Sequence, residues 1–364
     1  MEKNSNKKRR LVIIGAVPVV LIAAFLIFTF WPAGPAEMPT RALTTAEQQI
    51  VDASFDTNSL TVTAEEVYLA MRGGRDITVV GVINPLEELV PFSTSSSAIP
   101  GAYLVWRPDY SGGGSDAAIS PNVTGMRRSV AEMEALLSRA NVTSASDIVV
   151  YSADLMHDSA RFVWQLRMLG HQNIWYMDGG MNAWLAAEYP TGGSSRLADV
   201  ETRSNFVAPN YNPAAFNATL EMVIHALENP DEWIVIDTRA QAEFDGEQVG
   251  ASSGAFGTGR IANSVFIPWN AVIDPDTQLL RSEAEIADLF LDAIGGRNVI
   301  TYCQSGVRSA HTWLALTEVL GLENVWNYEG SWIEWSYAAS VYSDFDGARV
   351  LELTEEWTDN EGAI

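Results

Sequence analysis

The chain contains one cysteine, and its neighbours place it where a nucleophile could act. Cys303 follows the apolar run 299–302, and the polar loop 304–309 then leads into a helical pattern. The commonest fate of a free cysteine is to be a small buried hydrophobic residue, whereas a reactive cysteine is a thiolate. The residues around Cys303 decide between these two interpretations.

The loop after Cys303 favours the thiolate. Gly306 allows a tight turn, and Arg308 adds a fixed positive charge. Backbone N–H groups at the start of the following helix lack helical partners, so they can point at the sulfur. Such surroundings lower the pKa of a thiol from about 8.5 to about 3.5–7.5. We therefore predict that Cys303 is a thiolate and acts as a nucleophile.

Phosphate-ester hydrolysis is the nearest alternative chemistry for such a loop. Cysteine phosphatases carry a histidine before the cysteine and five residues between cysteine and arginine. In this chain Tyr302 precedes Cys303, and only Gln304 to Val307 separate the cysteine from Arg308. The tighter ring suits a sulfur atom better than a phosphoryl group.

The segment around Cys303 is the second copy of an internal repeat. Residues 149–184 align with residues 300–335 without a gap, across both a loop and a helix. The matched positions are Tyr151 with Tyr302, Leu169-Gly170 with Leu320-Gly321, Asn173 with Asn324, Trp175 with Trp326, Gly179 with Gly330 and Trp184 with Trp335. The chain is therefore two copies of one α/β unit.

The first copy lacks the residues of the reactive loop. In the register of the repeat, Ser152 takes the place of Cys303. Leu155 stands for the turn glycine, and His157 stands for Arg308. Serine is far too weakly acidic to be ionised by such a loop. We expect the first copy to be catalytically inert and to cover the mouth of the second copy's site.

Both copies alternate short β-branched runs with amphipathic stretches. In the second copy we predict strands over 232–237 and 298–302, and helices over 282–294 and 309–321. This alternation predicts an α/β fold, in which each copy is a parallel sheet with helices on both faces. Ligands of such sheets bind at the carboxyl ends of the strands, where Cys303 lies.

Composition divides the chain into six segments. We predict a cytoplasmic stub and transmembrane anchor over 1–32, a tether over 33–58, a non-catalytic domain over 59–190, a linker over 191–213, a catalytic domain over 214–343 and an acidic tail over 344–364.

The N-terminal segment predicts a membrane anchor. Four cations, residues 7–10, precede the uncharged stretch 11–32. About twenty helical residues span about 30 Å, the thickness of a bilayer core. The cations hold the short end in the cytoplasm, so both domains should face the outside. The alternative is a cleaved signal peptide with a cleavage site at residues 34–36, which would give a secreted protein.

The charge of the chain excludes one class of partner. The 364 residues carry a formal net charge of −24, and 47% of them are hydrophobic. A folded protein of this acidity has no electrostatic attraction for nucleic acid. We therefore expect no nucleic-acid partner.

Four motifs of the second copy resemble the rhodanese superfamily. They are VIDTR at 235–239, GRIANSVFIPW at 259–269, CQSGVRS at 303–309 and YEGSWIEW at 328–335. The family usually has Gly-His-Ile-Pro-Gly-Ala where this chain begins its second motif. Over roughly residues 60 to 340, the chain looks like a two-domain thiosulfate or 3-mercaptopyruvate sulfurtransferase.

The resemblance implies a function. Cys303 would take the outer sulfur of a small sulfur-containing anion as a persulfide and pass it to a thiol or to cyanide, with no cofactor and no metal. The substrate-binding residues would be Gln304, Ser305, Gly306, Val307, Arg308, Ser309 and Arg239. Arg239 could instead form a salt bridge within its domain. The alternative to an enzyme is a persulfide carrier that delivers sulfur to a partner protein.

The identity of the donor stays open at this point. Thiosulfate enzymes commonly have cations at the second and third loop positions, whereas mercaptopyruvate enzymes often have small neutral residues there. Gln304 and Ser305 are neutral, but Arg308 departs from the small residue typical of both groups. We favour thiosulfate or a related sulfane-sulfur donor.

Overall fold

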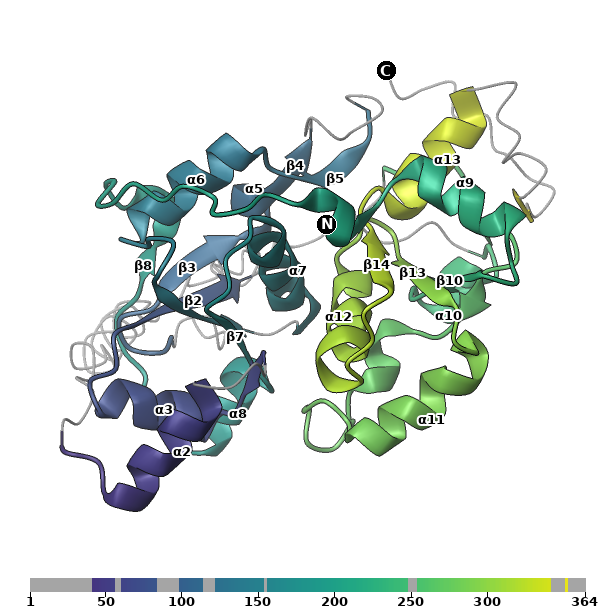
Figure 1. The fold of residues 1–364 in the computed structure, drawn as a ribbon. Helices are drawn as coiled ribbons and strands as arrows, with labels where there is room; N and C mark the ends of the chain where they lie inside the picture. The colour runs from purple at the N-terminus through teal and green to yellow at the C-terminus, as the bar shows by residue number, and fades with distance from the viewer. Residues whose placement is uncertain are drawn as a thin grey trace, which may run out of the picture.

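The structure is a computed structural model with two α/β lobes that lie side by side (Figure 1). It describes residues 41–55, 60–83, 98–113, 122–153, 156–247, 254–341 and 351–352. The predicted anchor over 11–32, the alternative cleavage site at 34–36, Leu155 and most of the predicted acidic tail lie outside the described residues.

Each lobe is built on a parallel sheet, and the two sheets share one strand order. The first sheet runs β1 (Thr61–Val62), β7 (Ile174–Met177), β6 (Asp147–Ser152), β2 (Ile77–Ile83), β3 (Tyr103–Trp106) and β8 (Ser195–Arg196). The second runs β9 (Asn217–Ala218), β14 (Val325–Tyr328), β13 (Asn298–Tyr302), β10 (Trp233–Asp237) and β12 (Val265–Phe266). The repeat in the sequence is therefore a repeat of the fold.

Both faces of each sheet are buried, as the apolar runs predict. Along β6, Ile148 and Val150 belong to one hydrophobic cluster, while Val149 and Tyr151 belong to another on the opposite face. The covering helices of the first lobe are α3 (Ala64–Arg72), α5 (Arg107–Tyr110), α6 (Val130–Arg139), α7 (Met156–Met168) and α8 (Gly180–Ala186). Those of the second are α9 (Leu220–Glu228), α10 (Gln241–Phe244), α11 (Glu283–Ile294), α12 (Arg308–Leu314) and α13 (Ser331–Val341).

The elements predicted in the second copy are present within a residue or two. The strand predicted over 232–237 is β10, and the strand over 298–302 is β13. Ser282 and Glu285 form a capping box at the start of α11, which fixes that boundary. The helix predicted over 309–321 differs in detail, because α12 continues as a π-helical turn over Ala315–Val319.

Two predicted boundaries of the first domain need correction. Residues Thr45–Phe55, within the predicted tether, form the helix α2. Its Val51 and Phe55 are buried in the core of the first domain, with the Phe55 ring 5.0 Å from that of Trp175. Within the predicted linker, β8 pairs with β3 at the edge of the first sheet. Apolar side chains and a strand edge therefore draw both segments into the domain.

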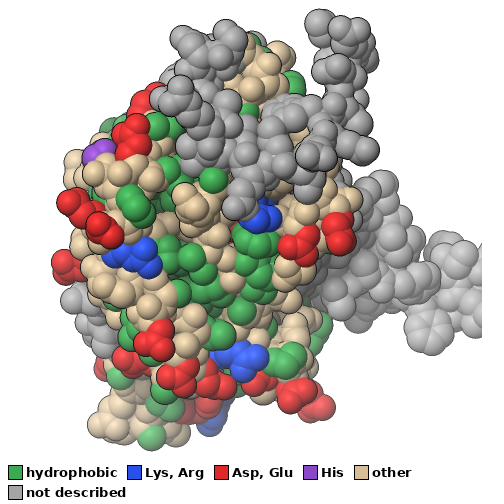
Figure 2. Space-filling model, turned by 90° about the vertical axis from the view of Figure 1, so that its right-hand side faces the viewer, with side chains coloured by type: hydrophobic (Ala, Val, Ile, Leu, Met, Phe, Trp, Pro, Cys, Tyr) green, Lys and Arg blue, Asp and Glu red, His purple; other side chains and the backbone are tan. Residues whose placement is uncertain are grey.

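The described residues contain no helix that is long and apolar enough to cross a bilayer. The face on the side of the second domain has hydrophobic side chains at its centre and acidic side chains around its edge (Figure 2). Among the described residues on this face, the basic side chains lie apart from one another (Figure 2).

The two domains meet through equivalent helices. In each copy, the helix that follows the fourth strand of the repeat, α7 or α12, packs against its counterpart (Figure 1). Trp164 and Trp313 belong to a hydrophobic cluster that spans both domains. The ring of His311 lies in this interface, where its Nε2 is 3.2 Å from the Tyr176 hydroxyl of the first domain.

The buried His311 predicts acid sensitivity of folding. Burial, together with the nearby His157, lowers the pKa of His311 to about 3, from an ordinary value of 6.5. Below pH about 6.5 the unfolded chain therefore binds a proton that the folded chain does not, and stability falls as the pH falls. We expect His311 to contribute a loss of up to about 1.4 kcal/mol per pH unit between pH 6.5 and 4.

Urea unfolding at pH 7.5 and 5.0 measures this loss. The variant His311→Gln, which can keep a hydrogen bond to Tyr176, should lose less stability on acidification than the wild type. His225→Gln, at an exposed position on α9, is the control and should behave as the wild type. Equal losses in all three proteins would contradict the assignment.

Candidate active site

The start of α13 holds Cys303 at the carboxyl end of β13. The backbone N–H of Cys303 donates to the Ser331 hydroxyl oxygen at 3.1 Å, and that hydroxyl donates to the Tyr328 carbonyl at 2.6 Å. The Cys303 carbonyl in turn accepts the N–H of Trp332 at 3.1 Å. Ser331 adopts a left-handed backbone with a φ of 52°, which is uncommon for a residue with a side chain. The first turn of α13 is thus shaped around the cysteine.

The loop surrounds the sulfur with hydrogen-bond donors. The backbone N–H groups of Ser305 and Ser309 bond to Sγ, and the Ser309 hydroxyl lies 3.5 Å from it. Cys303 is 1% exposed, and this burial opposes ionisation. The charge of Arg308 and the hydrogen bonds of the two serines outweigh it and hold the pKa of the Cys303 thiol below its ordinary value.

The Ser309 hydroxyl has one proton and two possible acceptors. Its Oγ lies 2.6 Å from Oδ1 of Asn327, whose Nδ2 donates to the Gly306 carbonyl at 2.9 Å. This second bond fixes which end of the Asn327 amide faces Ser309. A neutral thiol can donate to Ser309, and after ionisation the hydroxyl can turn its proton toward the sulfur. The loop can therefore satisfy both forms of Cys303.

Gly306 is the residue that closes the ring. Its φ is +72°, and a Cβ there would lie 2.8 Å from the Glu329 carbonyl oxygen and 2.9 Å from Nη1 of Arg161. Both the backbone conformation and the lack of space exclude a side chain at this position. The tight turn predicted for Gly306 is observed.

Arg308 is held by a carboxylate that the sequence pattern did not single out. Its guanidinium makes two hydrogen bonds to Glu243, at 2.6 and 2.8 Å. The Glu243 side chain is 4% exposed. Arg308 therefore acts on the sulfur as the positive end of an ion pair, which fixes its place and reduces its field.

Arg239 is committed within its own domain. Its guanidinium bonds both carboxylate oxygens of Asp237 and the Gly259 carbonyl, and it packs 4.9 Å from the Trp332 ring. The side chain is 1% exposed. Arg239 thus forms the internal salt bridge, which is one of the two roles predicted for it. Its role in binding the sulfur donor stays a prediction.

Gln304 and Val307 complete the loop as buried residues. Neither atom of the Gln304 carboxamide has a hydrogen-bond partner among the described residues, although the side chain is buried. A buried amide without a partner costs about 1–3 kcal/mol, a cost that a bound ligand can offset.

The first domain covers the loop but supplies no nucleophile from the equivalent position. Ser152 is buried at the end of β6. The cover is β5 (Thr124–Arg127), paired with β4 (Ser111–Gly113). A Cβ on Gly125 would lie 2.8 Å from the Ser305 Cβ, so the strand backbone lies directly against the loop. Cys303 itself is 1% exposed.

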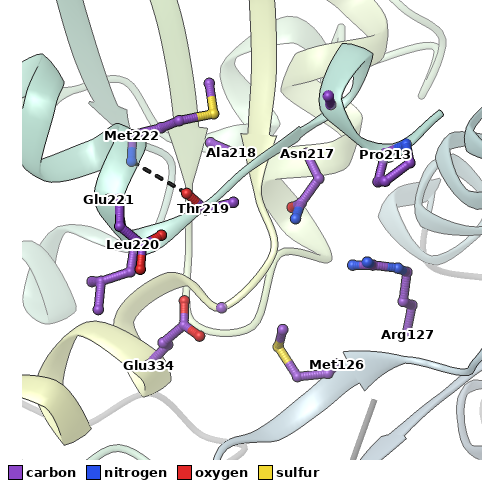
Figure 3. A pocket seen from close by; sticks show the side chains of 12 residues that line it. Met126, Arg127, Pro213, Asn217, Ala218, Thr219, Leu220, Glu221, Met222 and Glu334 are labelled. Atoms are coloured by element: carbon purple, nitrogen blue, oxygen red, sulfur yellow. Dashed lines mark hydrogen bonds between the residues drawn. The ribbon is translucent and has the colours of Figure 1, made fainter. Parts of the chain in front are cut away.

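A cavity of about 340 Å³ lies beyond the Glu329–Ser331 turn, at the carboxyl ends of β9 and β14. Figure 3 shows Met126 and Arg127 of β5 facing Glu334 of α13 and the residues that begin α9. Gly330 belongs both to the cavity wall and to the turn that holds Cys303. The described residues contain no cluster of side chains suited to a metal ion.

Sequence patterns missed several residues of the site. Glu243, Asn327, Glu329 and Ser331 all bond to the loop or to residues that touch it. Glu329 and Ser331 fall inside the motif at 328–335, which marked their place but not their roles. Only the fold brings Arg161 of the first domain to the loop.

Known proteins match this chain in sequence and in fold. A family model for the rhodanese-like domain matches residues 63–187 and 219–338. A thiosulfate sulfurtransferase of Corynebacterium glutamicum is 28% identical over 214 residues, which cover 55% of this chain and 66% of that protein, slightly less than two thirds. A Haloferax volcanii protein, provisionally named a thiosulfate sulfurtransferase, is 31% identical over 56% of this chain and 71% of its own length.

Solved structures agree on the fold. The Tum1 protein of Saccharomyces cerevisiae superposes with a TM-score of 0.62 at 18% identity, covering 77% of this chain and 95% of that one. An anaerobic ergothioneine biosynthesis enzyme of Chlorobium limicola gives a TM-score of 0.63 at 20% identity, covering 76% of this chain and 68% of its own.

The architecture and the loop define the class: paired α/β domains of which one carries a cysteine loop. The chain belongs to the rhodanese family, as a two-domain protein of the sulfurtransferase type. The resemblance predicted from four motifs is confirmed.

The ion pair at the loop predicts opposite effects of its two members. In Arg308→Gln the largest favourable influence on the thiolate is lost, so the pKa of Cys303 should rise by about one unit or more. In Glu243→Gln the countercharge is lost, so the pKa should fall further. The pH dependence of Cys303 alkylation by iodoacetamide measures both shifts, because only the thiolate reacts. An unchanged inflection in Arg308→Gln would show that the backbone donors alone set the pKa.

Proposed function

We propose that the protein is a sulfurtransferase that moves sulfane sulfur from thiosulfate, or a related donor such as 3-mercaptopyruvate, to a thiophilic acceptor through a Cys303 persulfide. The observation that carries the proposal is the ring of N–H and O–H donors around a buried sulfur whose pKa is held low. The curated relatives named as thiosulfate sulfurtransferases support the choice of donor.

The first half-reaction is a displacement at sulfur. The Cys303 thiolate attacks the outer sulfur of thiosulfate, a new S–S bond forms, and the old S–S bond breaks. Sulfite leaves with the electron pair of that bond, and the cysteine becomes a persulfide anion. No proton moves, so neither a general base nor a metal is needed.

The second half-reaction returns the enzyme to its starting state. A thiophilic acceptor such as cyanide or a thiolate attacks the terminal sulfur of the persulfide. The Cys303 sulfur leaves as a thiolate with the electron pair, and thiocyanate or a new persulfide departs. The Cys303 thiolate is the nucleophile of the first step and the leaving group of the second. Hydrogen-bond donors that stabilise this thiolate therefore assist both steps.

Gln304 is the residue we assign to donor recognition. Its buried carboxamide has no partner among the described residues, so an oxygen of the bound donor can supply one. A neutral amide also tolerates either a sulfonate or a carboxylate, which keeps thiosulfate and mercaptopyruvate both possible. Because the amide is uncharged, it does not discriminate between thiosulfate and mercaptopyruvate by their charge.

The cysteine is tested by Cys303→Ser. The wild type should convert thiosulfate and cyanide to thiocyanate, and the variant should lose this turnover by at least about a thousandfold because a serine hydroxyl is not ionised in the loop. Intact-protein mass spectrometry after thiosulfate alone should show one added sulfur in the wild type and none in the variant.

Two other outcomes of this assay are informative. Absence of turnover in the wild type, with the added sulfur still present, would favour the persulfide carrier over the enzyme. Absence of both would contradict sulfur transfer by Cys303. A higher kcat/KM with mercaptopyruvate than with thiosulfate would reverse the assignment of the donor.

We further propose that residues 11–32 anchor the protein in a membrane with both domains outside the cytoplasm. The support is the length of the uncharged segment and the four cations before it. In cell fractionation, the full chain should stay with membranes in high salt and be released by detergent, whereas a chain lacking residues 1–32 should be soluble. A soluble extracytoplasmic product that begins near residue 37 would show signal cleavage instead.

A further inference from the structure

An arginine of the inert domain reaches the loop of the catalytic domain. Arg161 lies on α7 and is fully buried. Its Nη2 donates to Oε1 of Glu329 at 2.5 Å, and its Nη1 lies 3.4 Å from the Gly306 carbonyl oxygen. One guanidinium thus touches both the turn behind the cysteine and the glycine that closes the ring.

A second arginine of the inert domain binds the same carboxylate. The backbone N–H of Arg127 donates to Oε1 of Glu329 at 2.5 Å, and the Arg127 guanidinium pairs with Oε2. Glu329 is 1% exposed. We call Arg127, Arg161 and Glu329 the clamp. Two cations face one anion, so the clamp carries a net positive charge beside the loop.

The bond to Gly306 controls where a neighbouring N–H points. In a trans peptide the C=O and the following N–H point in opposite directions. Asn327 at 2.9 Å and Arg161 at 3.4 Å both bond the Gly306 carbonyl. The N–H of Val307, which belongs to the same peptide, therefore points away from these two side chains.

The charge of Arg161 also reaches the sulfur. Burial lowers the pKa of Arg161 to about 9, and the charge of the Cys303 thiolate acts against that fall. By reciprocity, a cation at Arg161 favours the thiolate. The repeat places Thr312 at the equivalent position of the second copy. The first domain therefore offers a cation to the loop of the second, whereas the second offers none from this position to the first.

We infer that Arg161 is a positioning residue for sulfur transfer, by which the inert domain shapes the Cys303 loop and stabilises its anion. The inference rests on the proposed function for its effect on turnover, but its effect on the thiol can be measured without a sulfur donor. The charged groups around the loop that act with it are Arg308, Glu243, Arg239, Asp237, Arg127 and Glu329.

The experiment compares four variants of the full chain by the pH dependence of Cys303 alkylation. Arg161→Met should raise the inflection, by less than Arg308→Gln does, and Arg161→Lys should restore part of the shift, since an ammonium keeps the charge but not the fork geometry. Glu329→Gln removes the anion between two arginines, so its inflection should stay or move down. Arg167→Met is the matched control on α7, where Arg167 pairs with Glu318 instead, and should not shift.

These directions separate a positioning role from a merely structural one. Loss of packing alone would move Arg161→Met and Glu329→Gln the same way, and that result would overturn the inference. An unshifted inflection in a folded Arg161→Met protein would also overturn it. If Arg161→Met does not fold, the alkylation inflections of Arg161→Lys and Glu329→Gln can still be compared. The first should move up and the second should stay or move down.

Turnover provides the second readout. Arg161→Met should lower kcat for thiosulfate and cyanide by about tenfold or more with KM within about twofold, because the donor is still bound but the sulfur anion is less stable. The wild type could lack turnover while Arg161→Met still shifts the alkylation profile. That result would support Arg161 as a positioning residue and contradict only the proposed function. A rise in KM alone would assign Arg161 to donor binding and overturn the inference.

Discussion

The loop lowers the pKa of a buried thiol, and the backbone of the site is arranged to meet this constraint. Cys303 is 1% exposed, and burial by itself disfavours the thiolate. The loop can compensate only if its N–H groups converge on Sγ, which requires the left-handed backbone of Gly306 and the turn at Ser331. Two residues of the site, Gly306 and Ser331, therefore adopt the left-handed backbone conformation.

Every arginine near the sulfur is paired with a buried carboxylate. Arg308 bonds Glu243, Arg239 bonds Asp237, and two arginines of the first domain bond Glu329. In a chain of net charge −24, a mobile guanidinium would find many surface acids. Pairing it with a carboxylate on a fixed element holds the charge in one place, at the cost of a weaker field.

The fold and the nucleophile could be predicted from the sequence because both are marked by periodic or local residue patterns. The strand at 298–302, the capping box at Ser282 and the ungapped repeat all depend on residues close in the chain. Sequence reasoning did not reach Glu243 or Arg161, which are 65 and 145 positions from the loop residues they bond. It also placed α2 in a tether, because a short amphipathic helix packs on a domain for tertiary reasons that local composition does not carry.

Duplication places side chains of the first domain beside the cysteine loop of the second. The two copies pack through equivalent helices, α7 and α12, and each helix begins beside the loop of its own copy. This packing brings side chains of α7 close to the second loop without any insertion or extra segment. With serine at position 152, the first copy has no thiolate at the place that Cys303 takes in the second, and Arg161 on α7 lies against the second copy's loop instead. Arg161, opposite Thr312 in the repeat, has the properties expected of such a position: it is fully buried, charged, and bonded to the other copy rather than to its own.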